Sequence, residues 1–121
     1  NFIVRESSTG RQMAINRWHF NSWGQKYPWK KDNEVGDKIA RESKLAWFDP
    51  KIVLEGGAID VNGRGTCLTT SSCLLNTNRN GGLSAEKMGG YLKSYLGIKN
   101  VIWLDGALKG DDTDGSGKGK E

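Results

Sequence analysis

A single carboxylate separates two apolar runs in the stretch Ile52-Val53-Leu54-Glu55-Gly56-Gly57-Ala58-Ile59-Asp60-Val61. The first run predicts a buried strand over 51–55, and the glycine pair predicts a tight break before an alternating strand over 57–61. A buried, unpaired carboxylate costs on the order of several kcal/mol, so we expect a cationic partner for Glu55. The residues leave three readings open: an arginine or lysine of the same chain, a bound ligand, or a turn carboxylate directed to solvent.

Strands and helices alternate on both sides of this stretch. Alternation and β-branched residues predict further strands over 2–4, 16–23, 66–70 and 101–104. Asp32 and Ser84 are the expected N-caps of helices over 33–44 and 85–96, and Gly97 is placed to end the second. Asn62-Gly63 predicts a hairpin turn. The order gives an α/β fold of two ββαβ units, each with a mixed sheet.

The connecting segments are predicted from their polarity. Arg5 to Gly10 is expected to be a turn and Asn76 to Gly82 a loop. A short buried segment is expected over 73–75, between the strand over 66–70 and that loop. The aromatic loop from Gln25 to Lys31 either lines a pocket or covers the edge of the core.

Composition bounds the class of protein. The chain has 121 residues, of which 36% are hydrophobic, and this suits one small domain or a piece of a larger one. The net charge of +4 is spread along the chain, so a nucleic-acid-binding domain is the weakest of the functions considered. No apolar run approaches the roughly 20 residues of a membrane span. We therefore expect neither a nucleic-acid nor a membrane partner.

The two cysteines, Cys67 and Cys73, are predicted to be buried free thiols in a reducing compartment, although a disulfide between them is possible. With His19 as the sole histidine and no Cys-x-x-Cys pair, no metal site is expected. A Cys67 nucleophile with His19 as its base stays open as a lesser alternative. No signal peptide is visible, and we expect a cytoplasmic protein.

Several motifs resemble those of a known family. Trp18-His19-Phe20-Asn21-Ser22-Trp23-Gly24 is similar to the Trp-x-Phe-Asn-Ala-Trp-Gly segment of agmatine deiminases, and Tyr27-Pro28-Trp29 to the segment after it. The stretch 53–63 resembles the Glu-Gly-Gly strand pair of that family nearly letter for letter. Shorter matches follow over 68–70, 73–76, 79–80, 91–92, 95–97 and 101–104. The resemblance runs from about Arg17 to Gly115 and extends to bacterial-type peptidylarginine deiminases.

This resemblance implies a fold and an activity. The family belongs to the guanidino-modifying pentein superfamily, whose fold is a five-bladed α/β propeller of ββαβ units. About two units, roughly the middle third of the family chain, are expected here. The implied reaction hydrolyses a guanidinium carbon–nitrogen bond, converting agmatine to N-carbamoylputrescine and ammonia on the way to putrescine, a polyamine. It proceeds through a covalent cysteine adduct and uses no metal or cofactor.

The resemblance also implies a substrate site. It assigns Glu55 to the carboxylate that pairs with the substrate guanidinium, whose parallel N–H donors a carboxylate can bind in a bidentate manner. Asp112 is expected at the same cavity mouth. Trp18 and Trp23, with Trp29, are expected to line the cavity and stack on the cation.

The chain departs from the family pattern at the catalytic motifs. Gly115-Ser116-Gly117 stands where Gly-His-x-Asp is expected, and neither Cys67 nor Cys73 matches the motif of the nucleophile. The expectation is a fragment of an agmatine-deiminase-like hydrolase that is inactive alone. The alternative is a non-catalytic blade module that binds a guanidinium ligand or a partner chain.

The expected domain spans 1–115, followed by a flexible Gly/Lys tail over 116–121 that is not native to the fold. Two isolated propeller units leave sheet edges uncovered. We therefore expect self-association or a missing complementary segment, with apolar faces exposed at 52–54 and 101–104 or on the helices beside them.

Overall fold

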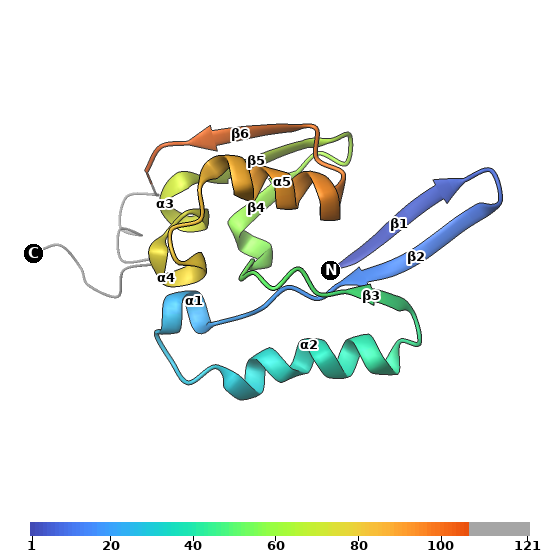
Figure 1. Cartoon of the computed structure of the whole chain (residues 1–121), viewed down its shortest axis with the longest axis horizontal. Helices are drawn as coiled ribbons and strands as arrows, with labels where there is room; N and C mark the ends of the chain where they lie inside the picture. The colour runs from blue at the N-terminus through green and yellow to red at the C-terminus, as the bar shows by residue number, and fades with distance from the viewer. Residues whose placement is uncertain (107–121) are drawn as a thin grey trace, which may run out of the picture.

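Two ββαβ units lie side by side in the computed structural model, which describes residues 1–106 (Figure 1). In the first unit, β1 and β2 are an antiparallel hairpin, and β3 returns parallel to β2 after the helices. In the second unit, β4 and β5 are antiparallel and β6 returns parallel to β5. The predicted α/β fold with two ββαβ units is therefore confirmed. The first unit comprises β1 (Phe2–Ser7), β2 (Gly10–Asn16), α1 (Ser22–Gln25), α2 (Lys30–Glu42) and β3 (Ala46–Phe48); the second comprises η1 (Gly56–Ala58), β4 (Ile59–Val61), β5 (Thr66–Thr70), α3 (Ser71–Leu74), α4 (Thr77–Asn80), α5 (Ala85–Leu96) and β6 (Asn100–Leu104).

The start of the first unit differs from the prediction. The strand predicted over 2–4 continues to Ser7. The prediction of a polar turn over 5–10 is therefore wrong, and the observed turn has two residues, 8 and 9. The strand predicted over 16–23 is also wrong, because β2 ends at Asn16 and only an isolated bridge, His19 to Val53, follows it. Positive φ angles at Ser22 and Trp23 turn the backbone into α1 instead. The β1–β2 hairpin projects away from the helices of both units (Figure 1).

Helix α2 begins earlier than predicted. Its N-cap is Trp29, without a side-chain cap, so the prediction of Asp32 as the cap is wrong; Asp32 lies in the first turn, where its charge still favours the helix. The buried Arg17 side chain anchors the helix, donating from Nη2 to Asp37 Oδ2 at 2.8 Å. Strand β3, which the sequence did not indicate, follows directly and closes the first sheet.

The connector between the two units, residues 49–55, contains the strand predicted over 51–55. The prediction of a strand over 51–55 is wrong, because this segment makes only one isolated β-bridge, between Val53 and His19. The second predicted strand begins at Ile59 rather than 57, because Gly56–Ala58 form η1. The bounds of β5 and α5 are those predicted from the sequence. Strand β6 begins one residue before its predicted start. The segment predicted to be buried over 73–75 has Leu74 in the core and lies partly in the short helix α3, whereas α4 replaces the loop predicted over 76–82.

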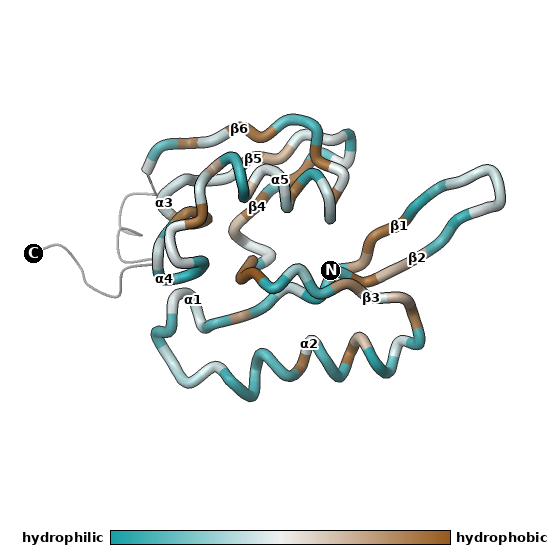
Figure 2. Tube along the Cα trace, in the orientation of Figure 1, coloured by the Kyte–Doolittle hydropathy of each residue, from teal (hydrophilic) through white to brown (hydrophobic). Residues whose placement is uncertain are grey.

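The hydrophobic core belongs to the second unit. Its buried side chains come from the connector, η1, β5, α3, α5 and the turn after α5, and comprise Ile52, Leu54, Ala58, Cys67, Leu74, Met88, Leu92 and Ile98. The prediction of an exposed face at 52–54 is therefore wrong for Ile52 and Leu54, whereas Ile102 and Leu104 of β6 are exposed as predicted. Figure 2 shows that α2 is hydrophilic along most of its length. On α2, Val35 and Ile39 are both about half exposed, so the first unit has little core of its own.

Two predictions lie outside the described residues: Asp112 at the cavity mouth, and the flexible tail over 116–121. Within residues 1–106, none of the helices combines the length and the apolar character needed to cross a bilayer.

Candidate functional site

Glu55 lies at the end of the connector, immediately before η1, and its side chain is only 10% exposed. Its Oε1 accepts a hydrogen bond from Arg79 Nε at 3.2 Å, and the Arg79 side chain is 1% exposed. The predicted cationic partner therefore exists, and it is an arginine of the same chain. This ion pair is buried, so removing either partner would leave an uncompensated charge.

Arg79 reaches Glu55 because α4 is a single, well-defined turn. Asn76 caps it, its side chain accepting from the backbone N–H of Asn78 at 3.2 Å. Gly81 ends it in the left-handed region at φ 63°, which favours glycine. Arg79 Nη1 also donates to Asn78 Oδ1 at 3.1 Å, which fixes the plane of the guanidinium.

The carboxylate of Glu55 retains capacity for a further partner. An ionised carboxylate offers about four lone-pair sites on two oxygens. Among residues 1–106, the Glu55 side chain accepts one hydrogen bond, the one from Arg79 to Oε1. Its second oxygen is therefore able to accept N–H donors from a cationic ligand.

The predicted aromatic residues pack against different neighbours. The Trp18 ring packs edge-on against Tyr95 of α5, with ring centroids 5.6 Å apart. The Trp23 ring is 45% exposed and packs edge-on against Phe20 at 5.3 Å. Trp29 is half-buried at the start of α2. The contacts of Trp18 and Trp23 are thus with other rings rather than with each other.

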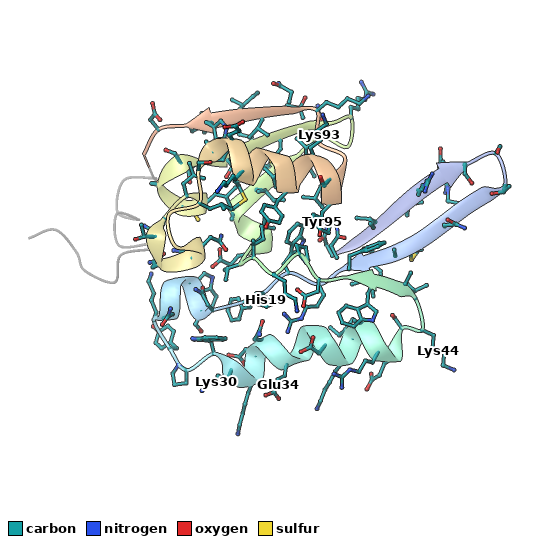
Figure 3. All side chains as sticks on the ribbon, viewed as in Figure 1. His19, Lys30, Glu34, Lys44, Lys93 and Tyr95 are labelled. Atoms are coloured by element: carbon teal, nitrogen blue, oxygen red, sulfur yellow. The ribbon has the colours of Figure 1, made fainter. Side chains whose placement is uncertain are left out.

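His19 and Asp49 form a polar pair that sequence reasoning did not anticipate. His19 Nε2 lies 2.9 Å from Asp49 Oδ1, and Lys51 Nζ lies 2.8 Å from Asp49 Oδ2. Burial raises the pKa of Asp49, but hydrogen bonds from Lys51 and the pairing with His19 outweigh it, so the pKa lies below its ordinary value. Figure 3 shows His19 at the junction of the two units, with Tyr95 directed toward the same region from α5. The pair ties the end of β3 to the segment that follows β2.

Cys67 is poorly suited to act as a nucleophile. The described structure contains no disulfide between Cys67 and Cys73; Cys67 is fully buried and Cys73 is half-buried. Burial, reinforced by the charge of Asp60, raises the pKa of the Cys67 thiol, so the reactive thiolate is disfavoured. His19 pairs with Asp49 instead of with Cys67. Residues 1–106 contain no cluster of three or more His, Cys, Asp or Glu side chains that could hold a metal ion.

Comparison with known proteins identifies the family to which this architecture belongs. The family described as Porphyromonas-type peptidyl-arginine deiminase matches the chain over residues 2–116. The chain belongs to this family. The agmatine deiminase of Medicago truncatula is 43% identical over 121 residues, a region that covers 92% of this chain and 32% of the plant protein. The family resemblance predicted from the sequence is confirmed.

Solved structures of family members share the fold. The agmatine deiminase of Enterococcus faecalis superposes with a TM-score of 0.78 at 33% identity, over 94% of this chain and 32% of that one. A variant of the agmatine deiminase of C. jejuni, solved with its substrate bound, superposes with a TM-score of 0.68 at 42% identity, over 87% and 32% of the two chains. The 121-residue chain thus spans about a third of the length of the relatives it matches, and its two units are part of a pentein fold.

Proposed function

We propose that this chain carries the substrate-binding carboxylate of an agmatine-deiminase-like hydrolase, which cleaves a guanidinium carbon–nitrogen bond and releases ammonia. Glu55 is the group that binds the guanidinium. The observation that carries the proposal is the buried Glu55 carboxylate, which Arg79 holds through one oxygen while the other is able to accept further donors. The structure of a variant of the C. jejuni agmatine deiminase, 42% identical to this chain, has been solved with substrate bound.

The chemistry of this arrangement suits a cation that carries N–H donors. A guanidinium or primary amine donates charge-assisted hydrogen bonds, which are strong in a site shielded from water. Asp112 is proposed to add a second carboxylate at the cavity mouth. Trp18 and Trp23, whose rings pack on Tyr95 and Phe20, are proposed to line the cavity beside the cation.

Covalent catalysis requires groups other than those at this site. The Cys67 thiol is buried and its pKa is raised, so it is unsuited to attack a guanidinium carbon. We therefore propose that the 121-residue chain binds the substrate without turning it over. The second candidate function, a blade module without catalysis, is favoured by the Arg79 partner, because an internal cation already compensates the charge of Glu55.

The first test is a titration with agmatine, followed by tryptophan fluorescence and by backbone amide chemical shifts. We expect a dissociation constant no tighter than about 1 mM, because a partial pocket offers few contacts. Glu55→Gln is expected to abolish the shifts. Glu86→Gln, which removes an exposed carboxylate of α5, is the matched control and is expected to change nothing. Identical shifts in Glu55→Gln would instead favour the structural ion pair alone.

The second test is an assay for ammonia release from agmatine and from arginine. We expect no release above the blank, since loss of a nucleophile commonly lowers kcat by about a thousandfold or more. Turnover that disappears only on Cys67→Ala or Cys73→Ala would overturn this expectation and make a local cysteine the nucleophile.

The remaining proposals concern the setting of the protein. Two cysteines without a disulfide between them in the described structure are typical of a reducing compartment, which supports a cytoplasmic location. The exposed apolar face of β6 supports self-association or pairing with a complementary segment, and the substrate of the assembled site would be a small guanidinium compound.

A further inference from the structure

The peptide unit of Val53, two residues before Glu55, is hydrogen-bonded along both edges. On one edge, the His19 amide donates to Ile52 O at 2.9 Å and the Leu54 amide donates to His19 O at 3.2 Å. On the other edge, the Val53 amide donates to Asn80 Oδ1 at 2.8 Å, and Asn80 Nδ2 donates to Val53 O at 2.9 Å. The connector therefore has a backbone neighbour on one side and a single side chain on the other.

The Asn80 amide takes the place of a neighbouring strand. A carboxamide offers one acceptor and two donors in a plane, which matches the exposed N–H and C=O of an extended peptide. Both of its polar atoms are engaged with the same residue, so the amide fixes the direction of the chain as well as its position. The backbone that leads into Glu55 is thereby held within hydrogen-bond distance of α4.

The rest of α4 is fixed as firmly. Asn21 Nδ2 donates to Asn78 O at 2.8 Å, which joins the turn at α1 to α4. Gly24, in the left-handed region at φ 90°, lies so close that an added Cβ would stand 2.2 Å from Asn78 Nδ2. The three consecutive residues Asn78, Arg79 and Asn80 thus contact the α1 turn, the Glu55 carboxylate and the Val53 backbone respectively.

We propose that Asn80 is a positioning residue for Glu55 in guanidinium binding, and this inference rests on the function proposed above. Arg79 holds one carboxylate oxygen through a hydrogen bond of 3.2 Å, which orients the side chain but does not fix its backbone. Asn80 supplies the backbone restraint, so that the second oxygen meets the ligand at a fixed place. Displacements of about 1 Å at such a site can weaken its function by as much as about a hundredfold.

The test compares Asn80→Ala with wild type in the whole 121-residue chain. We expect agmatine affinity to fall about tenfold, as the loss of a supporting hydrogen-bond partner typically does in other sites. We also expect faster hydrogen exchange at the Val53 amide and a changed Arg79 Nε–H resonance. Asn62→Ala is the matched control, because Asn62 likewise accepts backbone N–H groups, from Arg64 and Thr66, but in the β4–β5 turn. It is expected to leave agmatine affinity and the Arg79 resonance unchanged.

A second variant and a measurement on wild type test the proposal even if Asn80→Ala fails to fold. Asn80→Asp keeps the acceptor for the Val53 amide and replaces the donor with an oxygen that repels Val53 O. Its added charge would attract a cation, so weaker agmatine binding in this variant must come from altered position. In wild type, the Val53 amide should exchange far more slowly than the amide of the exposed Gly63.

The outcomes separate this inference from the proposed function. If wild type does not bind agmatine, the proposed function fails, and the role of Asn80 in guanidinium binding fails with it, even if Val53 is protected. If wild type binds and Glu55→Gln abolishes binding, but Asn80→Ala and Asn80→Asp both bind as wild type does, the positioning role alone is overturned. Rapid exchange of the Val53 amide in wild type would overturn it as well.

Discussion

At the scale of single residues, Asp49 joins the segment after β3 to His19, which follows β2. Its Oδ1 lies 2.9 Å from His19 Nε2 and accepts from the Lys51 amide at 3.0 Å, while Oδ2 pairs with Lys51 Nζ at 2.8 Å. Burial raises the pKa of this carboxyl, and these partners lower it further than burial raises it, leaving the pKa below the ordinary value of 3.8. The charged form of Asp49 is therefore the one that stabilises the fold.

The sign of the pH dependence follows from that shift. A carboxyl whose pKa is depressed in the folded state contributes stability that is present above its ordinary pKa and is lost as pH falls through the folded-state value. We predict that the free energy of unfolding of wild type falls more between about pH 6 and about pH 3 than that of Asp49→Asn. Urea unfolding at the two pH values measures this difference.

Asp105 provides the control for this prediction. It follows β6 as Asp49 follows β3, but it is exposed. Asp105→Asn is expected to keep the wild-type pH dependence. An equal dependence in wild type and Asp49→Asn would show that the His19–Asp49–Lys51 cluster contributes nothing to folding.

At the scale of elements, α5 is a helix that is capped at both ends but contains two glycines of low helix propensity. Ser84 accepts from the Lys87 amide at its start and Gly97 closes its end at φ 68°, but Gly89 and Gly90 lie within it. A Cβ added at either position meets no atom within 4 Å. The glycines therefore cost backbone entropy without a packing reason in the described chain.

Alanine at these positions should stabilise the protein. We predict that Gly89→Ala and Gly90→Ala each raise the free energy of unfolding by about 0.5–1 kcal/mol, measured by urea denaturation. Gly97→Ala is the opposing control and should lower it by about 1 kcal/mol, because alanine is strained in the left-handed region. A loss of stability on Gly90→Ala would mean that helix propensity does not govern this element.

The same local rules explain which elements could be predicted from the sequence. The bounds of α5 follow from Ser84 and Gly97, and the β4–β5 hairpin follows from Asn62-Gly63, because the signals are adjacent to the elements they control. The segment after Asn16 alternates like a strand, yet Trp23 has a positive φ in a turn that packs against α4. That contact is tertiary and leaves no local pattern in the sequence.

The candidate site was predictable in the same measure. Burial of a carboxylate predicts a cation near Glu55 on energetic grounds alone. The identity of that cation depends on α4, a four-residue helix 24 residues further along the chain, and could not be read from the apolar pattern. The role of Asn80 was equally hidden, since an asparagine before a Gly-Gly pair first indicates a turn.

At the scale of the whole molecule, burial is unequal. The core cluster lies in the second unit and the connector, whereas the first unit exposes large apolar side chains on its hairpin and on β3. On the second sheet, Leu68 of β5 and Ile102 of β6 are register partners, and both are exposed, as is Leu104. These three residues form an apolar strip beside the edge strand β6.

Exposed apolar strips and free strand edges favour association. We predict that the 121-residue chain self-associates at about 50 μM, a concentration at which contacts of micromolar affinity are populated. Ile102→Lys should shift it toward monomer, because lysine on an edge strand opposes edge-to-edge pairing. Sedimentation velocity measures the change, and the exposed position of Ile102 means that the variant should fold as wild type does.

Asn100→Lys distinguishes loss of the apolar contact from the effect of charge. Asn100 is two residues from Ile102 on β6, and alternation along a strand places both on the same face. The Asn100→Lys substitution adds the same charge to that face without removing an apolar side chain, so association should weaken less than in Ile102→Lys. A compact monomer of wild type at this concentration would refute association, and equal weakening by both variants would assign the association to charge rather than to the strip. Only a larger effect of Ile102→Lys is consistent with an apolar surface that a second copy of the chain covers.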